Sequence, residues 1–130
     1  MNSTSPSSAP APRFRDDIRR GEIYWVDWSP GRGSEQTGRR PALIIQNDQA
    51  NANGNYGLTL VATVSTHGKA VPTHVEVQPS PENGLRAVSY IKCEQLMTIE
   101  KARLEHRIGT LSSADMDRVV VALKISQGMR

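Results

Sequence analysis

The chain of 130 residues has the length of one ordinary domain, and a hydrophobic content of 37% is enough to build one core. A formal net charge of +3 suits an anionic partner without requiring one. The single cysteine, Cys93, excludes an internal disulfide, and no apolar run has the length of a bilayer crossing or the position of a secretory signal. We therefore expect one cytoplasmic domain with no membrane segment.

The N-terminal residues differ in composition from the rest of the chain. Residues 1–13 are almost entirely Ser, Pro, Ala and Thr, which offer too little apolar surface to offset the entropy of ordering them. A solvated stretch of mixed charge is expected to follow, leading to Gly21, where a regular pattern begins. We expect residues 1–19 to be a disordered tail and residues 20–130 to be the domain.

The sequence pattern in the first half of the domain predicts strands. Residues 22–28 alternate between two faces, which is the period of a strand, and Ser29-Pro30-Gly31 ends this pattern. Residues 42–45 form a continuous apolar run, as expected for a strand buried on both faces. Residues 47–57 are rich in Asn and Gly and predict a loop, with or without a short helical turn.

Residues 58–65 alternate again, and this pattern places the hydroxyls of Thr59, Thr63 and Ser65 on one side of a strand. Three further strands are expected at 71–77, 87–93 and 104–108, the first two separated by a turn-forming segment at 78–84.

The last element has the spacing of one helix face, because apolar residues recur at i, i+3, i+4 and i+7 from Met116 to Leu123. The segment 112–115 supplies an N-cap with an acidic residue three positions later, and Gly128 can end the helix. Several short strands followed by a helix predict a small, strongly bent sheet or barrel with a helix packed against it.

A polar loop connects the first two predicted strands. Gly33 and Gly38 bracket four polar residues, and the loop ends in Arg39-Arg40-Pro41. Pro41 restricts Arg40 to extended geometry. A basic pair at the edge of a strand can hold a phosphate through bidentate hydrogen bonds.

The order of residues along the chain resembles the MazF/PemK family of toxins. The residues that carry the resemblance are GEIYWVD at 21–27, Ser29-Pro30, GSEQ at 33–36, Gly38, RPALIIQN at 40–47, PTHVE at 72–76 and EQLMTI at 94–99. It covers roughly residues 20–126. The resemblance implies a mainly β (α+β) fold, a small SH3-like barrel of the CcdB/PemK type with a C-terminal helix.

The resemblance also implies an activity and partners. They are sequence-specific, metal-independent cleavage of single-stranded RNA, mRNA above all, by a homodimer that needs no cofactor. A cognate antitoxin, acidic and partly disordered, would inhibit the enzyme, and operator DNA would be contacted only through the antitoxin complex. Growth inhibition under stress is the implied role. Two other readings remain open: a binding module that does not cleave, and a gyrase inhibitor of the same barrel fold.

The family's catalytic arginine and threonine match Arg40 and Ser65. Serine thus stands where threonine is usual, and Thr66 follows it, so either hydroxyl could point into the site. We favour Ser65 because it shares the polar face of Thr59 and Thr63. Glu35 matches an acidic position in the mobile loop of the family and is a secondary catalytic candidate. Further candidates for RNA binding are Arg39, Gln36, Thr66, His67, Lys69, Arg86 and Gln95.

RNA cleavage without a metal requires attack by the neighbouring 2′-hydroxyl, a proton acceptor, stabilisation of charge and a proton donor for the leaving oxygen. Our hypothesis is that Arg40 stabilises charge while Glu35 or another group moves protons, since the pKa of arginine is too high for proton transfer. The histidines lack HxH or HxxxH spacing, and Cys93 stands alone, so no zinc site is expected. The two tryptophans are expected in core or dimer packing rather than in base stacking.

Overall fold

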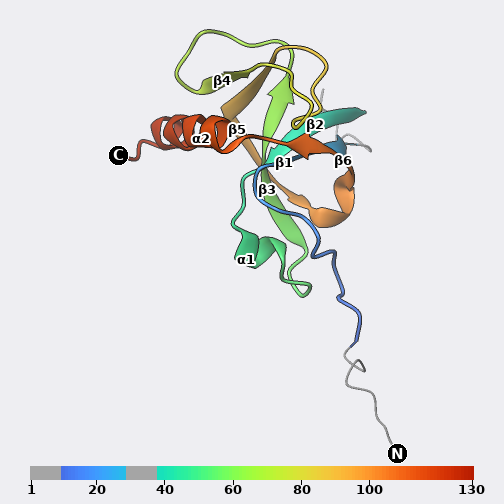
Figure 1. Ribbon diagram of the computed structural model, residues 1–130. Helices are drawn as coiled ribbons and strands as arrows, with labels where there is room; N and C mark the ends of the chain where they lie inside the picture. The colour runs from blue at the N-terminus through green and yellow to red at the C-terminus, as the bar shows by residue number, and fades with distance from the viewer. Residues whose placement is uncertain (1–9, 29–37) are drawn as a thin grey trace, which may run out of the picture.

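A computed structural model describes residues 10–28 and 38–130. Six antiparallel strands form one sheet in the order β4-β5-β3-β2-β1-β6. The described elements, shown in Figure 1, are β1 (Glu22–Asp27), β2 (Arg39–Ile44), α1 (Asp48–Asn51), β3 (Leu58–Ser65), β4 (His74–Val77), β5 (Ser89–Glu100), the short 3-10 helix η2 (Lys101–Arg103), β6 (Leu104–Thr110) and α2 (Ser113–Ser126).

Strand β2 lies in the middle of the protein and is buried on both faces, as its apolar run predicts. Leu43 belongs to a core on one face of the sheet, and Ala42 and Ile44 belong to a second core on the other face. The residue after the strand, Ile45, belongs to the first core. Because successive side chains of a strand point to opposite sides, one short strand contributes to both cores.

Helix α2 packs against β4 and β5 (Figure 1), where Val119 and Ala122 are buried in the first core. Its ends follow the predicted signals. The Ser112 hydroxyl accepts a hydrogen bond from the Asp115 N–H at 3.1 Å. At the other end Gly128 has a φ of 69°, and the Met129 N–H donates to the Lys124 carbonyl at 2.7 Å. This is the Schellman arrangement that ends many helices at a glycine.

Strand β5 is longer than the predicted 87–93. It runs from Ser89 to Glu100 and pairs with β3 along its length, with one break in register. Thr63 lies opposite Lys92, whereas Ala62 lies opposite Leu96, so residues 93–95 of β5 form a bulge. The second half of β5 was missed because residues 94–98 do not alternate between buried and exposed positions.

The turn between β4 and β5 joins the two edges of the sheet. The Thr110 N–H at the end of β6 donates to the Glu82 carbonyl in this turn at 2.8 Å. Gly84 has a φ of 67°, and a Cβ there would lie 2.2 Å from the Ile108 carbonyl oxygen. Only glycine permits both this backbone conformation and this close approach. The contact draws the bent sheet into a barrel.

The segment ahead of β1 is packed on the domain. Ile18 is fully buried in the second core, the Phe14 N–H donates to the Gly54 carbonyl at 3.0 Å, and an Arg15 guanidinium N–H donates to the Leu104 carbonyl at 2.9 Å. The expected solvated stretch before Gly21 is therefore wrong for these residues, because a buried apolar side chain and hydrogen bonds together hold the segment on the domain. We propose a domain boundary ahead of Phe14. Residues 1–9 of the predicted tail lie outside the described residues.

Lys101 is only 1% exposed. Its ammonium donates to the carbonyls of Ala50, Asn51 and Asn53 at 3.1, 3.1 and 3.0 Å, where α1 ends. The carbonyls of Ala50 and Asn53 also accept backbone N–H groups, and the ammonium is a further, charged donor at the end of the helix. Burial lowers the pKa of Lys101 below its usual value, and the charge of Asp16 opposes this shift. No sequence pattern marks this lysine as buried.

Replacing Lys101 with methionine is expected to lower the free energy of unfolding by about 3 kcal/mol, because the apolar stem is kept while three carbonyls lose the charged donor that they share. Urea unfolding of the two proteins measures the difference. Lys124→Met, at an exposed position of α2, is the matched control, with an expected change within about 0.5 kcal/mol. Equal effects of the two substitutions would contradict a role for the buried ammonium.

Candidate active site

The strands β2 and β3 part where the sequence resemblance placed its catalytic pair. They pair as Leu43 with Ala62 and Ala42 with Thr63, and the same register would set Arg40 opposite Ser65. The ladder ends before that pair. The Ile45 N–H points to β3, so by alternation the nitrogen of Pro41 does too, but proline has no N–H to donate. The missing bond lets the strands open at this point.

The opening is a recess of about 60 Å³. Its lining residues are Trp28, Arg40, Pro41, Thr63, Val64, Ser65, Lys92 and Gln95. Two of these side chains are cationic, and none of the described lining residues is acidic. Such a recess favours an anion, and the guanidinium fork of Arg40 matches the oxygens of a phosphate.

The geometry distinguishes Ser65 from Thr66. Ser65 lies in the recess, whereas Thr66 lines a separate groove. The Ser65 Oγ accepts a hydrogen bond from the His67 N–H at 3.0 Å. This bond uses an oxygen lone pair, so the hydroxyl hydrogen can still be donated to a bound anion. Ser65 is therefore the hydroxyl that faces the same space as Arg40.

Arg39 and Arg40 do not form one clamp. Consecutive side chains of a strand point to opposite faces, and only Arg40 lines the recess. Arg39 forms an ion pair with Glu105 and lies over the ring of Trp25, with its guanidinium carbon 5.3 Å from the ring centroid. The predicted basic pair is thus divided between two faces of β2.

The polar wall of the recess includes two residues on β5. The Thr63 hydroxyl donates to the Gln95 side-chain oxygen at 2.9 Å, which leaves the amide NH₂ of Gln95 to donate elsewhere. Lys92 lies opposite Thr63 in the register and was missed by the sequence reasoning, since only the register places it there. The expected row of hydroxyls is shorter than predicted, because Thr59 is buried and donates to the Asn51 side chain at 3.1 Å.

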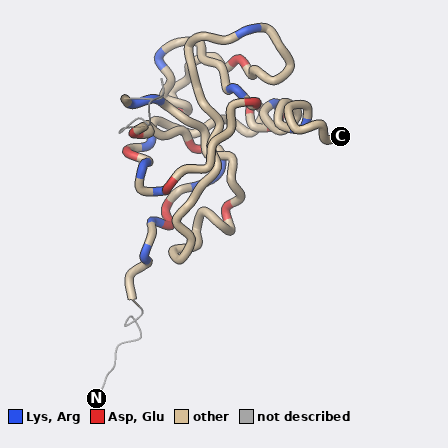
Figure 2. The backbone as a smooth tube through the Cα atoms, turned by 180° about the vertical axis from the view of Figure 1, so that it is seen from behind, with Lys and Arg blue, Asp and Glu red and all other residues tan. Residues whose placement is uncertain are grey.

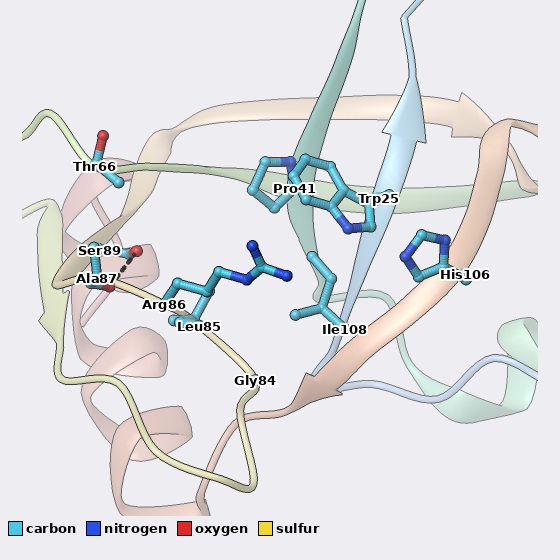
Figure 3. A pocket seen from close by; sticks show the side chains of 10 residues that line it. All are labelled: Trp25, Pro41, Thr66, Gly84, Leu85, Arg86, Ala87, Ser89, His106 and Ile108. Carbon is cyan, nitrogen blue, oxygen red and sulfur yellow. Dashed lines mark hydrogen bonds between the residues drawn. The ribbon is translucent and has the colours of Figure 1, made fainter.

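A second hollow, of about 460 Å³, shares only Pro41 with the recess. Figure 3 shows Arg86 extending into it toward Pro41 and Trp25, with His106 beside Trp25. Its lining is mainly apolar. Arg86 and Thr66, both candidates for RNA binding, therefore lie away from the recess. Trp28 is buried in the second core, as expected, while Trp25 is only partly buried in this groove.

The remaining predicted residues are dispersed. His67 and Lys69 are exposed in the connection between β3 and β4, and Glu35 and Gln36 lie outside the described residues. Cys93 is buried, and burial, together with Glu94, raises its pKa to about 11, which disfavours the thiolate. Figure 2 shows basic and acidic residues interspersed along the backbone.

Residues 10–28 and 38–130 contain neither a candidate metal site nor a candidate membrane-spanning helix. No group of three or more His, Cys, Asp or Glu side chains is placed to hold a metal ion. No helix in this part of the chain has the length and apolar character to span a membrane.

Solved structures share this fold. An endoribonuclease from Mycobacterial species, determined in complex with its cognate antitoxin, matches with a TM-score of 0.73 and 24% identity, over 87% of this chain and 97% of the other. MazF from Deinococcus radiodurans matches with a TM-score of 0.69 and 24% identity, over 86% and 97%. These neighbours confirm the predicted fold class, an SH3-like barrel of the CcdB/PemK type with a C-terminal helix.

Sequence comparisons agree. Residues 19–126 match the family described as the PemK-like, MazF-like toxin of type II toxin-antitoxin systems. The endoribonuclease MazF of Staphylococcus epidermidis is 44% identical over 115 residues, which are 86% of this chain and 92% of the relative. EndoA, an endoribonuclease of Bacillus subtilis (strain 168), is 40% identical over 109 residues, 84% and 93%. The chain therefore belongs to the PemK/MazF toxin family, and the predicted enzyme class, an endoribonuclease, is confirmed.

Proposed function

We propose that this toxin cleaves single-stranded RNA, mRNA in particular, at specific sequences in the cytoplasm, and that the recess between β2 and β3 is its active site. The observation that carries the proposal is that Arg40 and Ser65 line one recess, where β2 and β3 part at Pro41. A cationic side chain and a hydroxyl hydrogen thus face one small space suited to a phosphate.

The reaction we propose is attack of the 2′-hydroxyl on the adjacent phosphorus. A new bond forms between the 2′-oxygen and phosphorus, and the bond from phosphorus to the 5′-oxygen breaks. The products are a 2′,3′-cyclic phosphate and a 5′-hydroxyl. Arg40 and Lys92 oppose the negative charge that develops on the phosphate oxygens, and Ser65 donates a hydrogen bond to one of them.

Proton transfer falls to another group in this proposal. Arginine holds its proton too tightly to act as an acid or base near neutral pH. Glu35, from the connection between β1 and β2, is the proposed candidate for accepting the proton of the 2′-hydroxyl, and this proton is passed on to the leaving 5′-oxygen, so that the reaction consumes none. No step of the proposed reaction requires a metal ion.

Purified protein is expected to cut a long single-stranded RNA in the presence of EDTA. The new 5′ ends should accept phosphate from a polynucleotide kinase without prior phosphatase treatment, and the new 3′ ends should carry a cyclic phosphate. Mapping these ends gives the recognised sequence. Arg40→Ala is the control for a contaminating nuclease. Uncut RNA from folded, antitoxin-free protein, or cleavage that EDTA abolishes, would disprove the proposal.

For partners, we propose a homodimer neutralised by an acidic, partly disordered antitoxin that covers the cationic recess by charge and bulk. The toxin–antitoxin pair, rather than the toxin alone, would contact operator DNA. Two Deinococcus radiodurans MazE-MazF complexes, each with a TM-score above 0.6 to this chain, and the Mycobacterial endoribonuclease in complex with its cognate antitoxin support an antitoxin partner.

A further inference from the structure

The connection between β3 and β4, residues 66–73, begins beside Ser65 and arches over one end of the sheet (Figure 1). It carries His67 and Lys69, two of the candidates for RNA binding. Its backbone approaches β5 closely, because a Cβ on Gly68 would lie 2.2 Å from Cγ of Tyr90. Tyr90 lies opposite Ser65 in the β3–β5 register, and Ser65 lines the recess, so the connection passes next to the recess at Gly68.

The side chain of His74 links this connection to β5. His74, the first residue of β4, has a side chain only 8% exposed. Its Nδ1 accepts a hydrogen bond from the Lys69 N–H at 3.0 Å, and its Nε2 lies 2.8 Å from a carboxylate oxygen of Glu94. Both ring nitrogens are therefore engaged, one with the connection and the other with β5.

The two contacts define the protonation state of the ring. A backbone N–H can only donate, so Nδ1 must present its lone pair, and the single ring proton lies on Nε2. The contact with Glu94 is then a hydrogen bond from a neutral imidazole to a carboxylate, not an ion pair. A proton added at Nδ1 would face the Lys69 N–H and break that bond.

Glu94 belongs to the β5 bulge that also forms part of the recess. The bulge comprises residues 93–95, and Gln95 lines the recess. Burial pushes the pKa of Glu94 up, but hydrogen bonds from His74, from its own backbone and from Thr73 outweigh this and hold it below its usual value. Lys92, the cross-strand partner of His74, lines the recess as well.

We propose that His74 is a positioning residue for RNA cleavage: as the neutral, Nε2-protonated imidazole it ties the connection 66–73 to the β5 bulge. This inference rests on the proposed function. The tie sets the distance from His67 and Lys69, on the connection, to Gln95 and Lys92, which line the recess. His74 itself contacts neither reacting oxygen in this scheme and acts through the elements it joins.

Two substitutions at His74 separate the contribution of the Nδ1 hydrogen bond from that of the Nε2 hydrogen bond. In His74→Asn the side-chain oxygen can take the place of Nδ1 and accept from Lys69, whereas in His74→Gln the amide NH₂ can take the place of Nε2 and donate to Glu94. We expect kcat/KM on long single-stranded RNA to fall about tenfold in His74→Gln, mainly through KM, and about threefold in His74→Asn. His106→Asn, at an exposed position of β6, is the matched control, and its kcat/KM should stay within about twofold of the wild-type value.

Two readouts do not depend on cleavage. Nitrogen NMR of the full chain at neutral pH should show His74 protonated at Nε2 and not at Nδ1. Exchange of the Lys69 amide should be slow in the wild type and in His74→Asn but fast in His74→Gln. Protonation at Nδ1, or equal activity of the wild type and His74→Gln, would overturn the inference. Wild-type protein that leaves RNA uncut while showing the expected tautomer would instead overturn the proposed function.

Discussion

Arg40→Lys is expected to lower kcat/KM for RNA cleavage by about 100-fold, and Arg40→Ala by about 1000-fold, the range seen when a donor to a developing anion is removed. Lysine keeps the positive charge but loses the planar fork that gives two parallel hydrogen bonds to a phosphate. Cleavage of a fluorescent RNA containing the mapped site, with kcat and KM determined separately, measures the loss.

Arg39→Lys is the matched control, because it makes the same chemical change one residue away on the same strand. Arg39 is paired with Glu105 and lies over Trp25 on the face away from the recess, so we expect less than about a threefold change. If Arg40→Lys cleaved RNA as fast as the wild type, the bidentate role would be wrong. If Arg39→Lys lost as much activity as Arg40→Lys, the division of the two arginines between opposite faces would be wrong.

Ser65→Ala is expected to lower kcat by about 50-fold, because the hydroxyl that donates to the phosphate in our proposal is removed. Thr66→Ala should change kcat by less than about threefold, since Thr66 lines the groove beyond Pro41 and not the recess. Single-turnover cleavage of the same RNA separates these variants. A larger loss in Thr66→Ala than in Ser65→Ala would show that the catalytic hydroxyl belongs to Thr66 and not to Ser65.

The substitution at Ser65 also removes an acceptor for the His67 N–H, so part of its effect could come from a displaced connection. Ser65→Thr separates the two contributions, because it restores the hydroxyl as both donor and acceptor and is the residue usual at this position in the family. We expect it to retain at least half of the wild-type kcat. An inactive Ser65→Thr that is folded, as judged by circular dichroism, would contradict the proposed role of the hydroxyl.

Much of the fold could be predicted from local patterns. Strand β3 has the predicted bounds, 58–65, because successive side chains of this segment alternate between the two faces of the sheet, which is the period of a strand. Helix α2 begins and ends at its predicted caps, since capping depends on residues only three or four positions apart. The second half of β5 and the burial of Ile18 depend on partners distant in sequence, which local patterns do not record.

For the candidate site too, some residues could be predicted from the sequence and others only from the structure. The sequence, through its resemblance to the family, was enough to select Arg40 and Ser65, because the order of residues around them is specific. The sequence did not show that Arg39 and Thr66 face away from the recess, or that Lys92 and Gln95 face into it. Those assignments depend on which residues lie opposite one another across β2, β3 and β5.

The sequence by itself therefore determined the family, the order of strands and helix along the chain, and the two residues at the centre of the proposed chemistry. Only the tertiary structure decided which neighbouring side chains share one space. The reason is physical: a change of one position along a strand moves a side chain to the other face of the sheet. The register that settles the face is set by hydrogen bonds between strands, here ended at Pro41 and shifted by the bulge at 93–95.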